Sequence, residues 1–220
     1  MSTTPNPSSA RRVLSAIDRS GLWVVAIGAT LVAGIHLVLM VLAGTQMLGA
    51  GPLTVSGLAI ENPASPEFTE QLPAVTEAHY DSATVTVEGA PAGARWLLWT
   101  GQAASSLTAI GVCAALVWLC VRIGRQRPFG RSITTALNLV AAVIIVGGTL
   151  SQVLTGFGQA AAVDFLGPEA AAWPEDTHEG FTALLLTVDF APIGIGLALS
   201  VVAAAFGIGT RMQRDTEGLV

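Results

Sequence analysis

Two ionisable residues lie inside long stretches that otherwise carry no charge. Asp189 is the only acidic or basic residue between Glu179 and Arg211, and His36 lies in the uncharged stretch that follows Arg19. A carboxylate within a bilayer costs several kcal/mol unless it is paired, protonated or hydrated. An aspartate and a histidine that meet in such surroundings could move a proton or hold an ion.

Counting residues along each stretch places His36 and Asp189 at nearly the same depth, because a helix rises 1.5 Å per residue. We therefore predict that the two side chains lie close together inside a helix bundle. Pro192 has no amide to bond the carbonyl of Val188, so polar backbone is expected beside Asp189. The functional interpretation is a proton-responsive pair, and the simpler one is a buried polar contact that fixes helix register.

Two further polar side chains, Gln102 and Gln152, belong to rows of small and polar residues spaced three or four apart. The rows are Gln102, Ser106, Ala109, Cys113, Leu116 and Cys120, and Asn138, Ala142, Ile145, Thr149, Gln152 and Gly156. Close packing with hydrogen bonds between helices explains both rows. A substrate path between the helices is the alternative interpretation.

Four arginines occur within the segment 122–131. Next to a membrane, each arginine adds about 1 kcal/mol of attraction to anionic lipid, and such a cluster also sets the orientation of the chain. A sharper hypothesis is that these arginines bind a cytosolic protein. The candidates for that contact are Arg122, Arg125, Arg127 and Arg131.

The other candidates for catalysis or metal binding lack the required spacing. His178 has acidic neighbours, but the segment does not supply a ligand set with the spacing of a metal site. Cys113 and Cys120 are too far apart on one helix to form a disulfide. No zinc-protease, nucleophile-elbow or phosphate-loop motif occurs. We therefore expect no catalytic residue, no metal, no cofactor and no direct nucleic-acid binding.

The uncharged stretches predict four membrane-spanning helices. The chain is 52% hydrophobic and only 11% charged, whereas soluble domains have roughly 25% charged residues. A hydrocarbon core about 30 Å thick needs about 20 apolar residues in a helix. The expected spans cover approximately residues 22–48, 96–121, 133–157 and 181–209. The predicted fold class is an all-α membrane protein, an antiparallel four-transmembrane-helix bundle.

The charges are divided unequally among the segments that connect these stretches. Nine of the ten arginines lie in residues 1–20, 122–132 and 210–220, whereas residues 49–95 and 158–180 hold eleven acidic residues and one arginine. The positive-inside rule then places both termini in the cytoplasm, in a multi-pass protein of the cytoplasmic membrane. Residues 1–20 are expected to form a largely disordered tail, and residues 210–220 a second cytoplasmic tail.

The first outer segment, residues 49–95, is too long for a simple connection. Residues 53–60 and 82–88 alternate between apolar and polar side chains, as half-buried β-strands do. We expect a small extracytoplasmic β element here that caps the helix bundle. In the second outer segment we expect a short helical turn around residues 168–173.

Two segments of the sequence resemble a known protein family. The first is the Arg-x-x-Pro-Phe motif at Arg125–Phe129, and the second is the ending with Phe206, Gly209 and residues 215–220. Both resemble the domain-of-unknown-function 2975 family of small bacterial four-helix membrane proteins, and its YoaS-like group. That family has no established activity, so the resemblance supplies no catalytic residues. It implies a membrane partner of a transcription regulator, because members look like neighbours of small helix-turn-helix regulators.

The sequence therefore predicts a non-enzymatic accessory or regulatory protein of the membrane that acts with a cytosolic partner, such as a small helix-turn-helix regulator. The alternative is a small transporter or ion-coupled permease that uses Asp189 and His36. Replacement of Asp189 by asparagine would separate the two, because only the transporter should lose its coupling.

Overall fold

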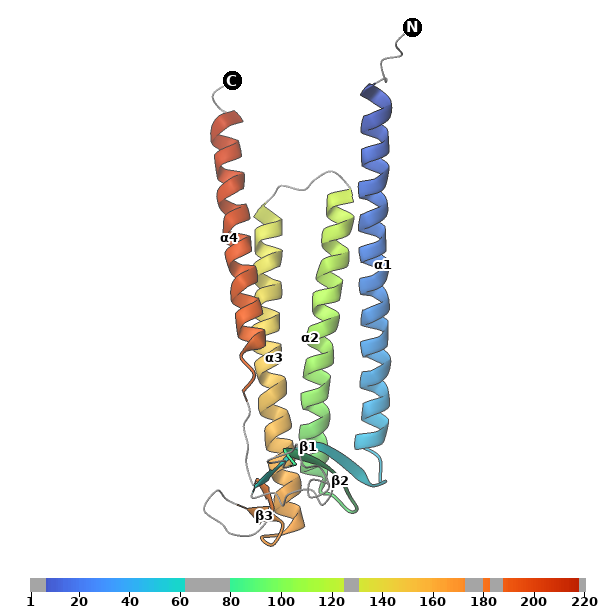
Figure 1. Ribbon diagram of the computed structural model, residues 1–220, viewed down its shortest axis with the longest axis vertical. Coiled ribbons are helices and arrows are strands. Elements are labelled where there is room, and N and C mark those ends of the chain that lie inside the picture. Colours follow the sequence, from blue (N-terminus) through green and yellow to red (C-terminus); the bar gives the residue numbers. More distant parts are fainter. Residues whose placement is uncertain (1–6, 62–79, 125–130, 173–179, 183–187, 218–220) are drawn as a thin grey trace, which may run out of the picture. The chain divides into compact units, whose positions relative to one another are not determined.

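The computed structural model describes residues 7–61, 80–124, 131–172, 180–182 and 188–217, and these residues are mostly helical (Figure 1). They form four long α-helices and four short strands. The helices are α1 (Pro7–Met47), α2 (Ala92–Gly124), α3 (Arg131–Leu166) and α4 (Ala191–Glu217). The strands are β1 (Leu53–Glu61), β2 (Ser82–Val87), β3 (Ala171–Ala172) and β4 (Gly180–Thr182).

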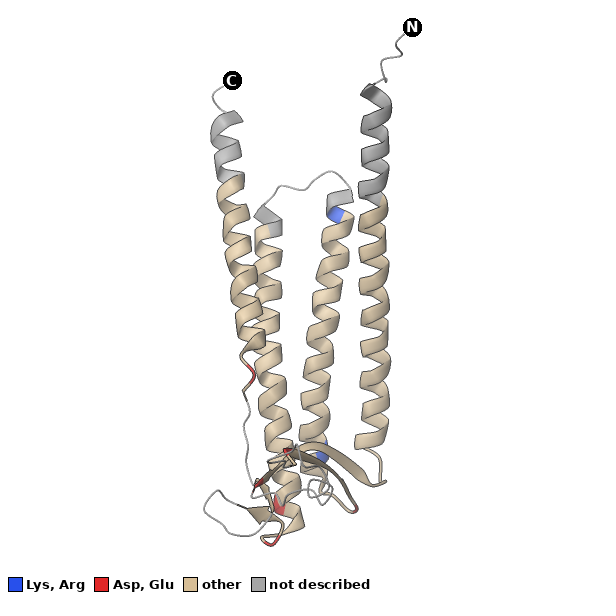
Figure 2. Ribbon diagram, viewed as in Figure 1, with Lys and Arg blue, Asp and Glu red and all other residues tan. Residues whose placement is uncertain are grey.

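Each helix contains a stretch that is long and apolar enough to cross a membrane. The stretches are Ser20–Met47, Ala92–Arg122, Thr134–Leu166 and Ala191–Gly209, with 28, 31, 33 and 19 residues. At 1.5 Å per residue, even the shortest is about 28 Å long, close to the thickness of a hydrocarbon core. Figure 2 shows acidic residues in and around the sheet, near the C-terminal end of α3 and directly before α4. The prediction of four apolar helices is confirmed.

All four helices extend beyond the predicted spans at one end or both, and α1 and α3 extend furthest. α1 begins at Pro7, so residues 7–20 are part of this helix and do not form a separate tail. Proline suits the first turn of a helix, and the next glycine or proline is Gly21. α3 continues past residue 157 to Leu166 and ends where Gly167 adopts a φ of +98°.

α4 begins at Ala191, later than the predicted start at residue 181. Pro192 is then the second residue of the helix, where an amide has no partner within the helix, so the proline costs no hydrogen bond. The first turn closes with the Gly194 amide donating to the Phe190 carbonyl, 3.0 Å away. Asp189 therefore precedes α4, and the expectation that it lies inside a membrane-spanning helix is wrong.

Both predicted strands form, and they pair with each other. β1 and β2 are antiparallel, and their register shifts between Val55 and Leu58, where Gly57 has a φ of +73°. A glycine in this left-handed conformation is typical of a β-bulge. β4 pairs with β1 and with β3, which gives the strand order β2-β1-β4-β3. A turn forms at residues 168–170, where the Ala170 amide donates to the Gly167 carbonyl at 3.1 Å, but Ala171–Ala172 form β3 and not the expected helical turn. A strand of two residues is too short to show alternation in the sequence.

The chain divides into two compact units. The first unit comprises Met1–Val38, Ser106–Gly148 and Phe190–Val220. The second unit comprises Leu39–Ser105 and Thr149–Asp189.

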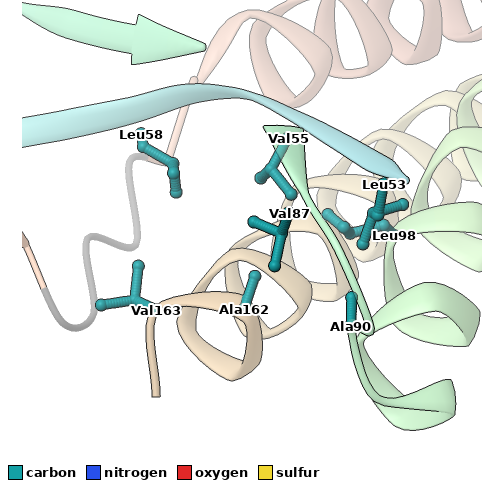
Figure 3. Close-up of a cluster of buried hydrophobic side chains, with 8 residues drawn as sticks. All are labelled: Leu53, Val55, Leu58, Val87, Ala90, Leu98, Ala162 and Val163. Atoms are coloured by element: carbon teal, nitrogen blue, oxygen red, sulfur yellow. The ribbon is translucent and has the colours of Figure 1, made fainter. Parts of the chain in front are cut away.

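The second unit contains the sheet and a core of branched apolar side chains. Figure 3 shows side chains of the two strands meeting those of α2 and α3. At roughly 25 cal/mol per Å² of apolar surface buried, such a cluster is the main source of stability for this unit. The buried members are Leu53, Val55, Leu58, Val87, Ala90, Leu98, Ala162 and Val163.

The first unit packs through small residues instead. α3 and α4 approach so closely that a Cβ added at Gly148 would lie 2.6 Å from Cβ of Pro192. A Cβ at Gly196 would lie 2.9 Å from the carbonyl oxygen of Ala141. Such close backbone contact between helices requires glycine at the crossing. Within the part of this unit whose side chains are described, the buried ones are Ala26, Ala29, Ser106, Cys113, Ala141 and Ala203.

Candidate functional site

Gln152 and Asp189, two of the predicted polar candidates, are in contact, but through the main chain of Asp189. Nε2 of Gln152 on α3 donates to the Asp189 carbonyl, 3.1 Å away. Oε1 of the same side chain accepts the Asp189 amide at 2.7 Å. One side-chain amide therefore binds both polar main-chain groups of a residue, as a neighbouring β-strand would. The contact holds the segment directly before α4 against α3.

The carboxylate of Asp189 has a simple structural explanation. Its side chain is exposed and lies directly before the N-terminus of α4, where the helix dipole favours a negative charge by about 0.3–1 kcal/mol. His36 is half-buried on α1 in the first unit, whereas Asp189 belongs to the second unit. Their proximity stays a prediction.

The predicted row of polar residues on α2 is not one contact face. Ser106 and Cys113 are buried, whereas Gln102 and Leu116 are exposed. The row was chosen because its residues are small or polar, but the close contacts of α2 with α3 depend on glycine. In the second unit, a Cβ at Gly101 would lie 3.0 Å from the main-chain nitrogen of Thr155 on α3.

Of the four arginines in the basic segment, Arg122 has a described side-chain contact. Its guanidinium lies 4.9 Å from the centre of the Trp118 ring on the preceding turn of α2, a cation–π contact. Arg131 is the first residue of α3. Arg125 and Arg127 lie outside the described residues, so the binding role of the segment stays a prediction.

A partly open pocket with a volume of ≈ 290 Å³ lies within the second unit, beside Gln152. One wall is formed by α3, and the opposite wall by residues 57–59 of β1 together with Thr182 of β4. All the described residues that line this pocket are uncharged. The lining residues from α3 are Ser151, Gln152, Thr155, Gly156, Gln159 and Ala160.

Polar side chains of this pocket are held in place by the protein itself. Nε2 of Gln159 donates to the carbonyls of Ser56 and Gly57 in the β1 bulge, at 2.9 and 3.4 Å. The Thr182 hydroxyl donates to Oε1 of Glu61 at 3.3 Å. Side-chain amides and hydroxyls have more hydrogen-bonding positions than these contacts use. The pocket therefore presents fixed polar groups with remaining capacity for a ligand.

Sequence reasoning found Gln152 but missed Gln159. The predicted third span ended at residue 157, so Gln159 fell outside the helix that carries it. The partners of Gln159 lie in β1, more than 100 positions away in the chain. The usable signal was the i, i+7 spacing of the two glutamines on one apolar helix.

Arg95 was missed as well, although it is the one arginine on the acidic side of the charge pattern. It is 8% exposed and ties the end of α1 to the start of α2. Nη1 donates to the carbonyls of Met47 and Gly49 at 3.0 and 2.7 Å, and Nη2 donates to Gly51 at 2.6 Å. Nε donates to Ala90 at 3.1 Å. A cation at the C-terminus of α1 also complements the helix dipole.

In the described part of the chain, no group of three or more His, Cys, Asp or Glu side chains is placed to hold a metal ion. Three hydroxyl side chains line the pocket, Ser151, Thr155 and Thr182, and the described lining includes no histidine to act as their general base.

The fold is that of a mostly helical protein, with a small sheet and four helices that are long and apolar enough to cross a membrane. Within that class, the chain belongs to the family described as protein of unknown function (DUF2975), whose model matches residues 83–220. The match covers more than half of the chain and begins within β2. The narrower YoaS-like assignment stays a prediction. No curated protein and no solved structure matches the chain.

Proposed function

We propose that this protein is a four-span protein of the cytoplasmic membrane with a regulatory, non-enzymatic role. Both termini lie in the cytoplasm, and the sheet of the second unit lies outside. The arginine-rich segment 122–131 and the tail 210–220 form the contact surface for a cytosolic protein, such as a small helix-turn-helix regulator. The proposal rests on the four apolar helices, the family and the division of charge.

The observation that carries this orientation is the environment of Arg95. Nine arginines lie on one side of the charge pattern, and the tenth would weaken the positive-inside argument if it were a solvated surface charge. Instead, its guanidinium is buried and donates to four main-chain carbonyls. Its position is therefore explained by packing, and the remaining basic residues favour one cytoplasmic face.

The transport alternative receives less support. It relied on an aspartate inside a helix of the membrane, and Asp189 precedes α4. The main chain of Asp189 is held by Gln152, which is a structural role. We therefore develop the regulatory proposal alone.

The orientation is tested by labelling single cysteines in intact cells with a membrane-impermeant maleimide. In a background with Cys113→Ala and Cys120→Ala, the variants are Glu169→Cys in the second unit and Glu217→Cys at the end of α4. The proposal expects labelling of the first variant before lysis and of the second only after lysis. The opposite pattern contradicts the orientation.

The cytosolic contact is tested by cross-linking in cells, followed by identification of proteins joined to residues 122–132 or 210–220. A triple variant, Arg125→Gln, Arg127→Gln and Arg131→Gln, should reduce the cross-linked product at least tenfold. Arg-to-Lys changes at the same positions keep the positive charge that sets orientation, and serve as the topology control. As a matched control, Asp81→Asn, Glu88→Gln and Glu169→Gln should leave the product unchanged. Unchanged cross-linking in the Arg-to-Gln variant would exclude this contact surface.

A further inference from the structure

The pocket between α3 and the bulge of β1 has no role in the proposed contact with a cytosolic protein. We propose that it binds a neutral, hydroxyl-rich small molecule about the size of one sugar ring. The inference goes beyond the regulatory proposal, because binding at this site needs only the folded second unit. Its supporting observations are the volume, the chemistry of the lining and the fixed positions of its polar groups.

The volume selects a small ligand. Pockets for drug-sized molecules usually span about 300–1,000 Å³, and this one, at ≈ 290 Å³, lies at the lower end. Since a water molecule occupies about 30 Å³ in the liquid, the space corresponds to roughly ten waters. One sugar ring or a similar polyol fits this size.

The lining selects a neutral polar ligand. A charged ligand would need an opposite charge within the pocket to replace its lost hydration, and the described lining offers none. A purely apolar ligand would leave unused the hydrogen-bonding positions of the lining amides and hydroxyls that the protein itself does not fill. Hydroxyl groups both donate and accept, so they can use the remaining hydrogen-bonding positions of Gln152, Thr155 and Gln159. Leu58 and Ala160 supply apolar surface for the carbon–hydrogen face of a ring.

The two glutamines are already in position for a ligand. Gln152 is held by the main chain of Asp189, and Gln159 by the carbonyls of the β1 bulge. Because both side chains are already ordered by these hydrogen bonds, they lose little conformational freedom when a ligand binds, and the entropic cost of association is lower. Gly156 lies between them, about one helical turn from each, and its lack of a side chain leaves space for a ligand at the centre of the α3 wall.

The depth of the pocket along α3 suits a ligand that arrives from outside the cell. Gln152 lies 18 residues beyond Thr134, the start of the apolar stretch, which is about 27 Å along the helix. A hydrocarbon core about 30 Å thick that begins at Thr134 therefore ends near Gln152. This placement alone rests on the proposed orientation, and the binding measurements below do not depend on it.

The test uses the full-length protein, purified in a detergent without a sugar headgroup so that the detergent cannot compete. The neutral probes are D-glucose, N-acetyl-D-glucosamine and myo-inositol, and saturation-transfer NMR measures their binding. D-glucuronate is the charged probe of matched size, and cyclohexanol is the apolar one. We expect at least one neutral probe to bind with a Kd below about 10 mM, at least tenfold tighter than both comparison compounds.

Variants locate the bound probe. Ala160→Leu fills the space between the two walls and should weaken binding at least tenfold. Thr155→Val keeps the shape but removes a hydroxyl, and should weaken binding several-fold. Thr100→Val is the matched control, because Thr100 is a helical threonine of the same unit whose hydroxyl bonds the carbonyls of Trp96 and Leu97 outside the pocket. Its binding should be unchanged.

Hydrogen exchange on the unaltered protein gives the same answer without any variant. A bound neutral probe should slow exchange at residues 57–59 and 182 relative to the unliganded protein. The proposal is overturned if none of the three neutral probes binds below about 10 mM, or if glucuronate or cyclohexanol binds as tightly. It is also overturned if Ala160→Leu folds and binds normally, or if protection appears only elsewhere in the chain.

Discussion

The two units bury different kinds of side chain, although α2 and α3 contribute to both. In the second unit the buried set includes Leu53, Val55 and Val163, which are large and branched. Among the described side chains of the first unit, the buried ones are Ala, Ser and Cys. Its large apolar side chains, such as Leu139 and Val201, are 65% and 70% exposed.

This difference in buried side chains is expected if one core forms in water and the other in lipid. In water, burying branched apolar side chains is the main driving force for folding. In lipid, apolar side chains gain little by leaving the solvent, and helices associate through close contact between small residues. The sheet core of the second unit has the side chains of a core that folds in water, whereas the buried residues of the first unit are typical of helices that pack in lipid. The comparison supports the proposed placement of the sheet outside the membrane.

The largest expected effect is the loss of a branched side chain from the core of the second unit. Leu53→Ala should lower the free energy of unfolding by about 2–5 kcal/mol, because Leu53 is 1% exposed and its removal leaves a cavity. Leu139→Ala on α3 of the first unit should change it by less than about 0.5 kcal/mol. Chemical unfolding in a fixed detergent measures both. Equal losses would mean that the two units do not differ in how they are stabilised.

Removal of the buried guanidinium should come next. Arg95→Met keeps the volume but leaves the carbonyls of Met47, Gly49 and Gly51 without these donors. The expected loss is about 3 kcal/mol, since unsatisfied buried acceptors are costly. Arg122→Met, at the other end of the same helix, should cost no more than about 1 kcal/mol, the value of its contact with Trp118.

Hydrogen exchange at residues 47–51 distinguishes this role from a general loss of stability. The Arg95 variant should speed exchange in that segment more than in α3. Arg95→Lys should recover part of the loss, because lysine donates hydrogen bonds but lacks the planar fork that reaches several carbonyls. A variant that is as stable as the unaltered protein would show that solvent replaces the guanidinium.

The same contrast explains how far the sequence predicts the structure. Uncharged stretches predict four apolar helices, because the requirement for about 20 apolar residues is local. Alternation predicts β1 and β2, because each strand is long enough to show it. The pocket was not predicted, since Gln159 and the β1 bulge are brought together only by the fold. The start of α4 was misplaced because hydropathy alone does not show where Pro192 allows a helix to begin.

Close helix packing in the first unit predicts a smaller but specific effect. Gly196→Ala places a Cβ 2.9 Å from the Ala141 carbonyl oxygen and should cost about 1–3 kcal/mol. Gly194 lies two positions earlier on the same helix, and a Cβ added there by Gly194→Ala has no neighbouring atom within 4 Å. It should be neutral or stabilise the helix by up to about 1 kcal/mol. Thermal unfolding of the pair measures the difference, and equal melting temperatures would contradict close α3–α4 packing.

The smallest expected effect concerns a buried hydroxyl of the first unit. Ser106 is 1% exposed, and within the described part of the chain its Oγ has no hydrogen-bond partner. A buried polar group without a partner is destabilising, so Ser106→Ala should leave the unfolding free energy unchanged or raise it by less than about 1 kcal/mol.

Ser151→Ala is the matched change in the second unit, where the hydroxyl donates to the Gly101 carbonyl at 2.8 Å. That variant should lose about 1 kcal/mol, because a satisfied bond is removed. The same change to alanine is therefore expected to alter the unfolding free energy in opposite directions at the two serines. Chemical unfolding in one detergent measures both values. A loss at Ser106 equal to that at Ser151 would show that small residues in the first unit also act through hydrogen bonds, and that close packing alone does not hold that unit together.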